Sequence, residues 1–225
     1  MIHILTARSI LGESRMVSEL SQYIKPTYQV LIVAFSFFPH EIATENQYDF
    51  MHEKGGTYYD KMVTMFSSYG ILEQQISWIH YYKDRTLSAI EKIKQADIIY
   101  FPGGAPDLMM KRINEFGIKE AIEQHQGIFI GSSAGAMIQL NHYHISKDRE
   151  YRSFSYEQGL NLLKGFSIEV HYDRKRKQKS GMRKVWRAWR HDIYAIPDDG
   201  CMVVDHGKIH LIGSARQIYT KKGKI

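Results

Sequence analysis

The chain has 225 residues, of which 44% are hydrophobic and 24% charged, and its formal net charge is +6. This composition is typical of a folded globular protein and excludes disordered and fibrous classes. The length is enough for a full-sized core, so we expect one α/β domain over residues 1–225. No apolar run approaches the roughly 20 residues that cross a bilayer, so no membrane partner is expected.

Two features of the sequence bear on location. The first ten residues lack the basic flank and the longer apolar stretch of a signal peptide, and they fit a short buried strand better. Cys201 is the only cysteine, so no internal disulfide can form, and a reducing compartment is expected. We therefore predict a cytoplasmic protein.

Short apolar runs alternate with helical patterns along the first 130 residues. The predicted strands are Ile2–Leu5, Val30–Phe35, Ile76–Ile79, Asp97–Phe101 and Gly127–Ile130. The predicted helices are Ser14–Tyr23, Gly56–Ser68, Asp84–Gln95 and Gly117–Gln124. This alternation is typical of βαβ units, so we expect a mostly parallel central sheet flanked by helices on both faces.

The pattern is mixed beyond residue 140. Ile168–His171 and Ile193–Ile196 are predicted strands. Cys201–Asp205 and Lys208–Ile212 are predicted to form a C-terminal β-hairpin that turns at His206 and Gly207. No repeat and no long linker divides the chain.

The segment Gly131-Ser132-Ser133-Ala134-Gly135 fits the pattern G-x-S-x-G. It follows an apolar strand and precedes a predicted helix, Ala134–Leu140. A serine on such a turn has a strained backbone and tolerates only small neighbours, while its hydroxyl lies at a helix N-terminus. A Gly/Ser-rich loop is the plain alternative, but the context favours Ser133 as a nucleophile, with Ser132 beside it contacting substrate.

A second pair of glycines follows the strand at residues 98–101, in Pro102-Gly103-Gly104. Adjacent glycines at the carboxyl end of a parallel strand let the backbone approach a ligand closely. We expect the N–H groups of Gly104 and Ala134 to form an oxyanion hole, and Gly103 and Ala105 to contact substrate. Taken alone, the same residues would be interpreted as a simple turn.

A serine nucleophile needs a base within hydrogen-bond reach. Among eleven histidines, His171 is the best candidate because it ends a predicted strand. His142 and His144 have a spacing that could hold a metal, but we expect them to point away from the site. No carboxylate or cysteine set completes their ligands, so neither metal nor cofactor is predicted.

The orienting acid is less clearly indicated. Asp198 follows a predicted strand, and Asp199 is an alternative one residue later. Pro-Asp-Asp-Gly is also a common turn composition. Asp148 is a further candidate, in a polar segment that we expect to be exposed. We rank Asp198 modestly above the other two.

Four segments of the chain, named at the end of this paragraph, resemble the dipeptidase E and cyanophycinase family of serine peptidases. They occur in the family's order and approximate spacing. The resemblance implies a fold related to class I glutamine amidotransferases, with serine in place of cysteine. It implies Ser133 as nucleophile, His171 as base, and the Gly104 and Ala134 amides as oxyanion hole. Family members cleave peptide bonds adjoining aspartate. The matching segments are Phe101-Pro102-Gly103-Gly104, Gly131-Ser132-Ser133-Ala134-Gly135-Ala136, Val170-His171-Tyr172 and Ile196-Pro197-Asp198.

Two positions depart from the family pattern. Many members have asparagine after the glycine pair, where this chain has Ala105, which affects the expected choice of substrate. The third catalytic position is often glutamate, and here it is Asp198. This departure bears on whether the serine and the histidine have a third, acidic partner.

The basic charge is concentrated in residues 173–190, which hold nine Lys/Arg and one Asp. The rest of the chain carries 21 basic and 23 acidic residues. Met182, Val185, Trp186 and Trp189 have helical spacing, which predicts an amphipathic helix docked on the domain. A solvated basic helix is the plainest interpretation. Cations such as Arg174 could also attract an acidic peptide, and nucleic-acid or membrane-surface binding ranks last.

The sequence therefore predicts a serine exopeptidase or dipeptidase that acts on small, Asp-containing peptides through an acyl-enzyme. A homodimer is compatible with it. One alternative is an α/β-hydrolase esterase in which Ser133 works with Asp198 and His206 or His210. Another is a non-catalytic, amidotransferase-like protein that binds a partner through residues 173–190.

Overall fold

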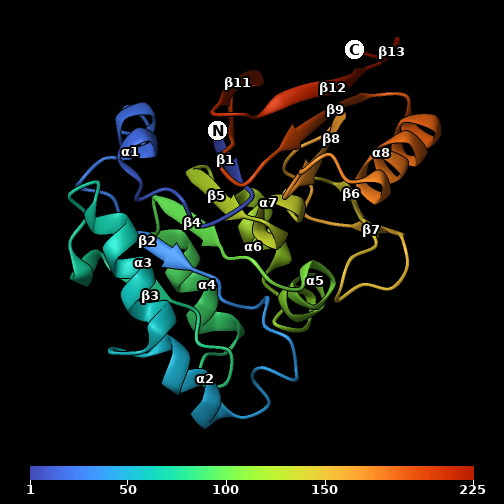
Figure 1. Ribbon diagram of the computed structural model, residues 1–225. Coiled ribbons are helices and arrows are strands. Elements are labelled where there is room, and N and C mark those ends of the chain that lie inside the picture. Colours follow the sequence, from blue (N-terminus) through green and yellow to red (C-terminus); the bar gives the residue numbers. More distant parts are fainter.

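A seven-stranded sheet forms the centre of the protein in a computed structural model that describes residues 1–225 (Figure 1). The strand order is β11-β10-β1-β5-β4-β2-β3. Strands β1 to β5 are mutually parallel, and the β10–β11 hairpin is added antiparallel at the β1 edge. The bounds are β1 (Ile2–Thr6), β2 (Val30–Ile32), β3 (Ile76–Trp78), β4 (Ile98–Phe101), β5 (Ile128–Ser132), β10 (Cys201–Asp205) and β11 (Lys208–Ile212).

Helices cover both faces of this sheet because its central strands are apolar on both sides. Every residue of β4 and β5 is buried, as expected for parallel strands with helices above and below. Ile99 and Phe101 belong to one buried cluster, and Ile98 and Tyr100 belong to the other.

Each cluster is completed by its own group of helices. The Phe101 side packs against α4 (Thr86–Gln95), α5 (Pro106–Glu115), α6 (Lys119–Gln124) and the short α7 (Ala134–Met137). The Tyr100 side packs against α1 (Ser14–Leu20), α2 (Glu45–His52) and α3 (Thr57–Ser67). A 3₁₀ turn, η1 (Glu73–Gln75), leads into β3.

A second sheet, of order β13-β12-β9-β8, lies beside the first, near the carboxyl ends of its parallel strands (Figure 1). Helix α8 packs on it through Met182 and Val185, while its basic side chains face solvent. A two-stranded ribbon, β6–β7, joins the two sheets. The bounds are β6 (His142–Ile145), β7 (Ser155–Gln158), β8 (Phe166–Val170), α8 (Arg176–Trp189), β9 (Asp192–Ile196), β12 (Arg216–Thr220) and β13 (Gly223–Lys224).

The predicted fold class is confirmed: an α/β protein with a mostly parallel central sheet, helices on both faces and a C-terminal hairpin. The predicted helix at Ala134–Leu140 is shorter than expected and ends at Met137. Helix α5 was missed because it follows Pro-Gly-Gly, a turn signal, yet Pro106 at its first position is compatible with a helix start. None of the helices has the length and apolarity needed to cross a bilayer.

Two buried histidines make the stability of this fold sensitive to acid. Burial lowers the pKa of His3 and of His52 to about 4. His3 is hydrogen-bonded to Gln139, and His52 to the Tyr48 carbonyl. Between pH 6.5, the ordinary pKa of histidine, and pH 4, the unfolded chain therefore binds more protons than the folded one.

We predict that the free energy of unfolding falls as pH is lowered from about 6.5 to about 4, by up to roughly 3 kcal/mol for each histidine. Urea titrations at several pH values measure this slope. His52→Gln should flatten it, whereas His142→Gln, which changes an exposed side chain, should not. An unchanged slope in His52→Gln would contradict the prediction.

Candidate active site

Ser133 occupies the turn between β5 and α7, in a strained backbone conformation with φ 50° and ψ −112°. Its N–H donates to the Thr6 carbonyl at 2.8 Å, which fixes the turn against the end of β1. A Cβ at Gly131 would lie 2.1 Å from the Gly135 carbonyl oxygen, and one at Gly135 would lie 1.9 Å from the Phe101 carbonyl oxygen. Both glycines are therefore required by backbone packing, which explains the G-x-S-x-G pattern.

His171 and Asp198 are brought together by the pairing of β8 with β9. The strands are parallel, with Val170 opposite Ile196, so the residues that follow each strand lie side by side. His171 Nδ1 lies 2.7 Å from Asp198 Oδ1, and His171 Nε2 lies 2.9 Å from Ser133 Oγ. The structure thus unites the three residues that the sequence proposed as a catalytic set.

The arrangement also fixes the direction of the hydrogen bonds. The carboxylate of Asp198 can only accept, so His171 donates through Nδ1–H and presents an Nε2 lone pair to the Ser133 hydroxyl. The His171 and Asp198 side chains are 48% and 54% exposed, so the set is open to solvent. Arg8 Nη1 lies 3.5 Å from Asp198 Oδ2. Sequence reasoning missed Arg8, although its position just after β1 places it at the same edge of the sheet.

The Pro-Gly-Gly loop is fastened to residue 36 on both sides. Ser36 Oγ donates to the Gly103 carbonyl at 2.6 Å, and Ala105 N–H donates to the Ser36 carbonyl at 2.6 Å. Gly104 has φ 137°, and a Cβ there would lie 2.2 Å from the Ser36 carbonyl oxygen. Sequence analysis missed Ser36 because nothing in its local sequence marks it.

The proposed oxyanion donors are free to bind a ligand. Gly104 N–H makes no hydrogen bond among those of the loops, and Ala134 N–H, at the first position of α7, has no acceptor within its own helix. Gly104 also lines the same cavity as Ser133. Gly103 approaches Ser133 more closely still, because a Cβ on it would lie 3.3 Å from the Ser133 Cβ. Both glycines thus lie beside the candidate nucleophile.

Three of the predicted substrate contacts lie elsewhere. The Ser132 side chain is 1% exposed and bonds the Tyr100 hydroxyl at 2.9 Å, inside the core. Ala105 is fully buried at the start of α5. Arg174 is exposed but does not line the cavity, whereas Lys175 and its neighbour Lys177 do.

A cavity of about 590 Å³ opens beside Ser133. The expectation that His144 points away from the site is wrong, because β6 turns back toward β8 and His144 lines this cavity. His144 Nε2 lies 2.7 Å from Glu169 Oε2. Asp148 also lines the cavity, but its Oδ1 accepts backbone N–H groups of its own loop, so it is not the partner of His171. The basic residues around the cavity are Lys147, Arg149, Lys175 and Lys177.

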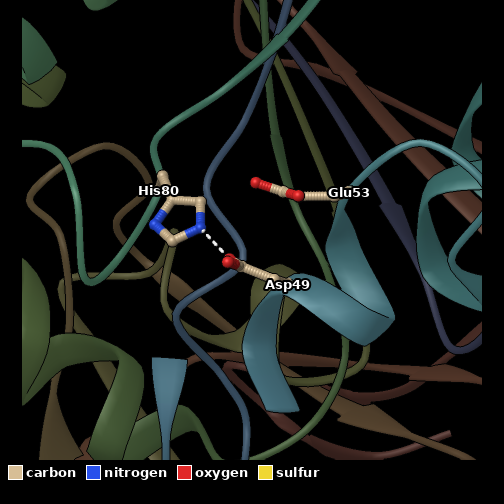
Figure 2. Close-up of side chains that lie close together, drawn as sticks. All are labelled: Asp49, Glu53 and His80. Atoms are coloured by element: carbon tan, nitrogen blue, oxygen red, sulfur yellow. Dashed lines mark hydrogen bonds and ion pairs between the residues drawn. The ribbon is translucent and has the colours of Figure 1, made fainter. Parts of the chain in front are cut away.

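A second polar cluster, which does not line this cavity, has the residue types of a metal site. Asp49, Glu53 and His80 hold their ligand atoms within 4.8 Å of one another (Figure 2). The cation there is supplied by the chain: Lys83 Nζ lies 2.8 Å from Asp49 Oδ2 and 2.6 Å from Glu53 Oε1. These two bonds raise the pKa of Lys83.

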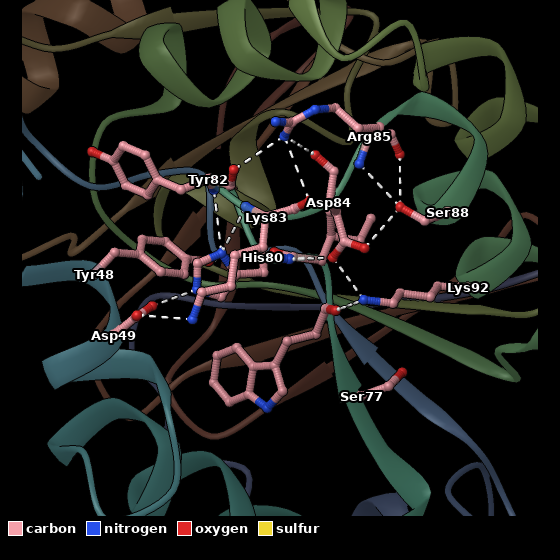
Figure 3. A network of polar contacts seen from close by, with 12 residues as sticks. Tyr48, Asp49, Ser77, His80, Tyr82, Lys83, Asp84, Arg85, Ser88 and Lys92 are labelled. Atoms are coloured by element: carbon pink, nitrogen blue, oxygen red, sulfur yellow. Dashed lines mark hydrogen bonds and ion pairs between the residues drawn. The ribbon is translucent and has the colours of Figure 1, made fainter. Parts of the chain in front are cut away.

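The same cluster continues into a wider network that ties α2 to the segment between β3 and α4 (Figure 3). His80 N–H donates to Asp84 Oδ2 at 2.7 Å, and Lys92 Nζ donates to the same oxygen at 2.6 Å. The charges compensate one another within the network. Its geometry is that of a structural ion-pair network.

The model of peptidase family S51 matches residues 18–212 of this chain, which include Ser133, His171 and Asp198. The chain belongs to peptidase family S51. This S51 member is accordingly a serine-type peptidase, a hydrolase. No curated protein sequence is significantly similar to it.

Solved structures share the fold of this S51 peptidase at low sequence identity. One is a Listeria monocytogenes EGD-e protein provisionally described as peptidase E, with TM-score 0.65 and 17% identity, covering 93% of this chain and 96% of its own. Another is a peptidase from an acI-B1 Actinobacterium, with TM-score 0.67 and 14% identity, covering 97% of this chain and 94% of its own.

We predict that Gly135→Ala destabilises the protein by about 3 kcal/mol or more, because its Cβ would overlap the Phe101 carbonyl and force α7 away from the end of β4. Gly207→Ala is the matched control, since that hairpin glycine has open space around its Cα and carries only the penalty of a positive φ, about 1 kcal/mol. Urea denaturation compares the two. Equal stability of both variants would contradict the packing argument.

Proposed function

We propose that this S51 peptidase is an exopeptidase or dipeptidase that cleaves small peptides through an acyl-enzyme on Ser133. The observation that supports it is the continuous hydrogen-bonded chain from Ser133 Oγ through His171 to Asp198, at 2.9 and 2.7 Å. The chain order of serine, histidine and acid differs from the serine, acid, histidine order of α/β-hydrolases. Neither His206 nor His210 lines the cavity, which argues against the esterase alternative.

The acylation step follows from the geometry. Ser133 Oγ attacks the carbonyl carbon of the scissile bond while His171 Nε2 takes the hydroxyl proton. Asp198 accepts the Nδ1–H bond, which holds the tautomer and stabilises the imidazolium. The Gly104 and Ala134 amides donate to the oxyanion. His171 then gives its proton to the leaving amine, the C–N bond breaks, and an ester remains on Ser133.

Deacylation repeats these roles with water as the nucleophile. His171 accepts a proton from water as its oxygen attacks the ester carbonyl, and then returns that proton to Ser133 Oγ as the ester bond breaks. The half-exposed His171 side chain leaves room for the attacking water. The products are a free carboxylate and the regenerated hydroxyl.

Cavity size and charge support the choice of substrate. A volume of about 590 Å³ lies in the range of sites for small molecules and short peptides. The four basic side chains around it favour peptides that carry a carboxylate side chain, such as Asp-containing peptides. Of the nine basic residues in 173–190, Lys175 forms an ion pair with Asp173. Most of the positive charge of this segment therefore has no acidic partner.

The only thiol in the chain supports serine rather than cysteine chemistry. Cys201 is buried in β10, and burial raises the pKa of its thiol to about 12. A thiol that stays protonated near neutral pH is a poor nucleophile. We retain the cytoplasmic location as part of this proposal, since the cysteine is unpaired. The homodimer and the absence of a nucleic-acid partner stay predictions.

Ser133→Ala is expected to abolish labelling by a fluorophosphonate and to lower kcat/KM for peptides by at least about 1,000-fold, because the acyl-enzyme cannot form. Intact-mass analysis of the labelled protein and peptide turnover are the measurements. Ser132→Ala removes the neighbouring buried hydroxyl and should keep its labelling. Labelling of Ser133→Ala at the wild-type rate would refute the assignment.

Asp198→Asn is expected to reduce kcat about 100- to 10,000-fold, since an amide at this position favours the wrong tautomer of His171. Asp199→Asn is the control, because Asp199 accepts a hydrogen bond from the Ser214 hydroxyl and does not contact His171. The kcat of this variant should stay within a few-fold of wild type. Steady-state kinetics on one peptide compares the two. A larger loss in Asp199→Asn would transfer the role to that residue.

A further inference from the structure

Glu169 is a carboxylate in the wall of the Ser133 cavity that the acyl-transfer steps do not use. It lies on β8, two residues before His171, which follows the end of that strand. Both side chains line the cavity. Glu169 is only 5% exposed, so its charge is almost completely removed from bulk water.

The hydrogen bonds of Glu169 are unevenly distributed between its two oxygens. Oε2 accepts from His144 Nε2 at 2.7 Å and from Ser146 Oγ at 3.0 Å. Oε1 has no hydrogen-bond partner in the protein. Oε1 is not sealed off from solvent, so a donor that enters the cavity can reach it.

Glu169 has no permanently charged partner in contact with it. His144 is 3% exposed, and its Nδ1 is buried without a partner. The ring contacts Glu169 through its other nitrogen, Nε2. No lysine or arginine lies within ion-pair distance of Glu169. A carboxylate that is 5% exposed and has no lysine or arginine partner is a favourable place for a cation carried by a ligand.

We propose that Glu169 Oε1 binds a primary ammonium group of the substrate and so selects peptides that carry one next to the scissile bond. This inference rests on the function proposed above. Two sources supply that chemistry: the free α-ammonium of the first residue, or the side chain of a lysine before the scissile bond. The first source would restrict cleavage to the end of a peptide, which gives the exopeptidase action a structural basis.

Glu169→Gln tests the proposal because it removes the charge but keeps the size and an acceptor oxygen for His144 and Ser146. The substrates are matched peptide pairs drawn from those that the wild type cleaves. One pair has a free or an acetylated N-terminus, and the other has lysine or norleucine before the scissile bond. The rate of fluorophosphonate labelling at Ser133 is measured in parallel, since that probe carries no ammonium group.

We expect Glu169→Gln to lower kcat/KM about 10- to 100-fold for the ammonium-bearing member of one pair, with little change for its neutral partner. The labelling rate should stay within about two-fold of wild type. The pair that responds identifies the source of the ammonium. Glu150→Gln is the matched control, because it removes the same charge from an exposed side chain in the adjoining loop. In each peptide pair, it should leave the ratio of kcat/KM between the ammonium-bearing and the neutral member unchanged.

Several results would overturn the proposal. One is a Glu169→Gln variant whose preference for the ammonium-bearing peptide is unchanged. Another is an equal loss of that preference in Glu150→Gln. A third is Ser133 labelling that falls in parallel with peptide turnover in Glu169→Gln, which would indicate a structural role only. If Glu169→Gln does not fold, Glu169→Asp keeps the charge but withdraws it by one methylene. It should then lower kcat/KM for the ammonium-bearing peptide alone. A wild type that neither labels at Ser133 nor cleaves peptides would refute the proposed function itself, a different failure from lost selectivity with turnover intact.

Discussion

The site depends on a close approach between two backbone segments, the first turn of α7 and the end of β4. Gly135 lies against the Phe101 carbonyl at a distance that no side chain would permit. This contact lets α7 start directly above the carboxyl ends of β4 and β5. The Ser133 turn is thereby held between the last residue of β1, through the Thr6 carbonyl, and the Pro-Gly-Gly loop. Serine and oxyanion donors are positioned by the same packing.

The site is divided between two sheets with different tasks. The central sheet supplies the nucleophile and the free amides, and the smaller sheet supplies the base and the acid through the β8–β9 pair. Residues far apart in sequence thus meet at one junction. Strand β6 and the loop that follows it line the cavity and contribute His144, so this segment shapes the substrate region as well as connecting the sheets.

Local sequence carried some of this information and not the rest. The Ser133 turn was predictable because its small residues form a short local pattern between an apolar strand and a helix. Gly131 is required by Gly135, four residues later, although Gly135 itself is required by Phe101 of β4. Asp198 could be ranked only modestly above Asp199, since a Pro-Asp-Asp-Gly turn looks the same whichever carboxylate meets the histidine. The β8–β9 register places Asp198 beside His171. Ser36 and Glu169 were missed because each gains its place from contacts with distant segments.

The strained backbone at Ser133 and His171 has a consequence for how this protein can be changed. Both residues have positive φ, 50° and 53°, a region where glycine is at ease and other residues carry a penalty of about 1–3 kcal/mol. The rest of the fold must offset that penalty. Selection for thermostability alone would therefore favour glycine at these two positions, and a chain that retains both side chains has kept chemistry at the expense of stability.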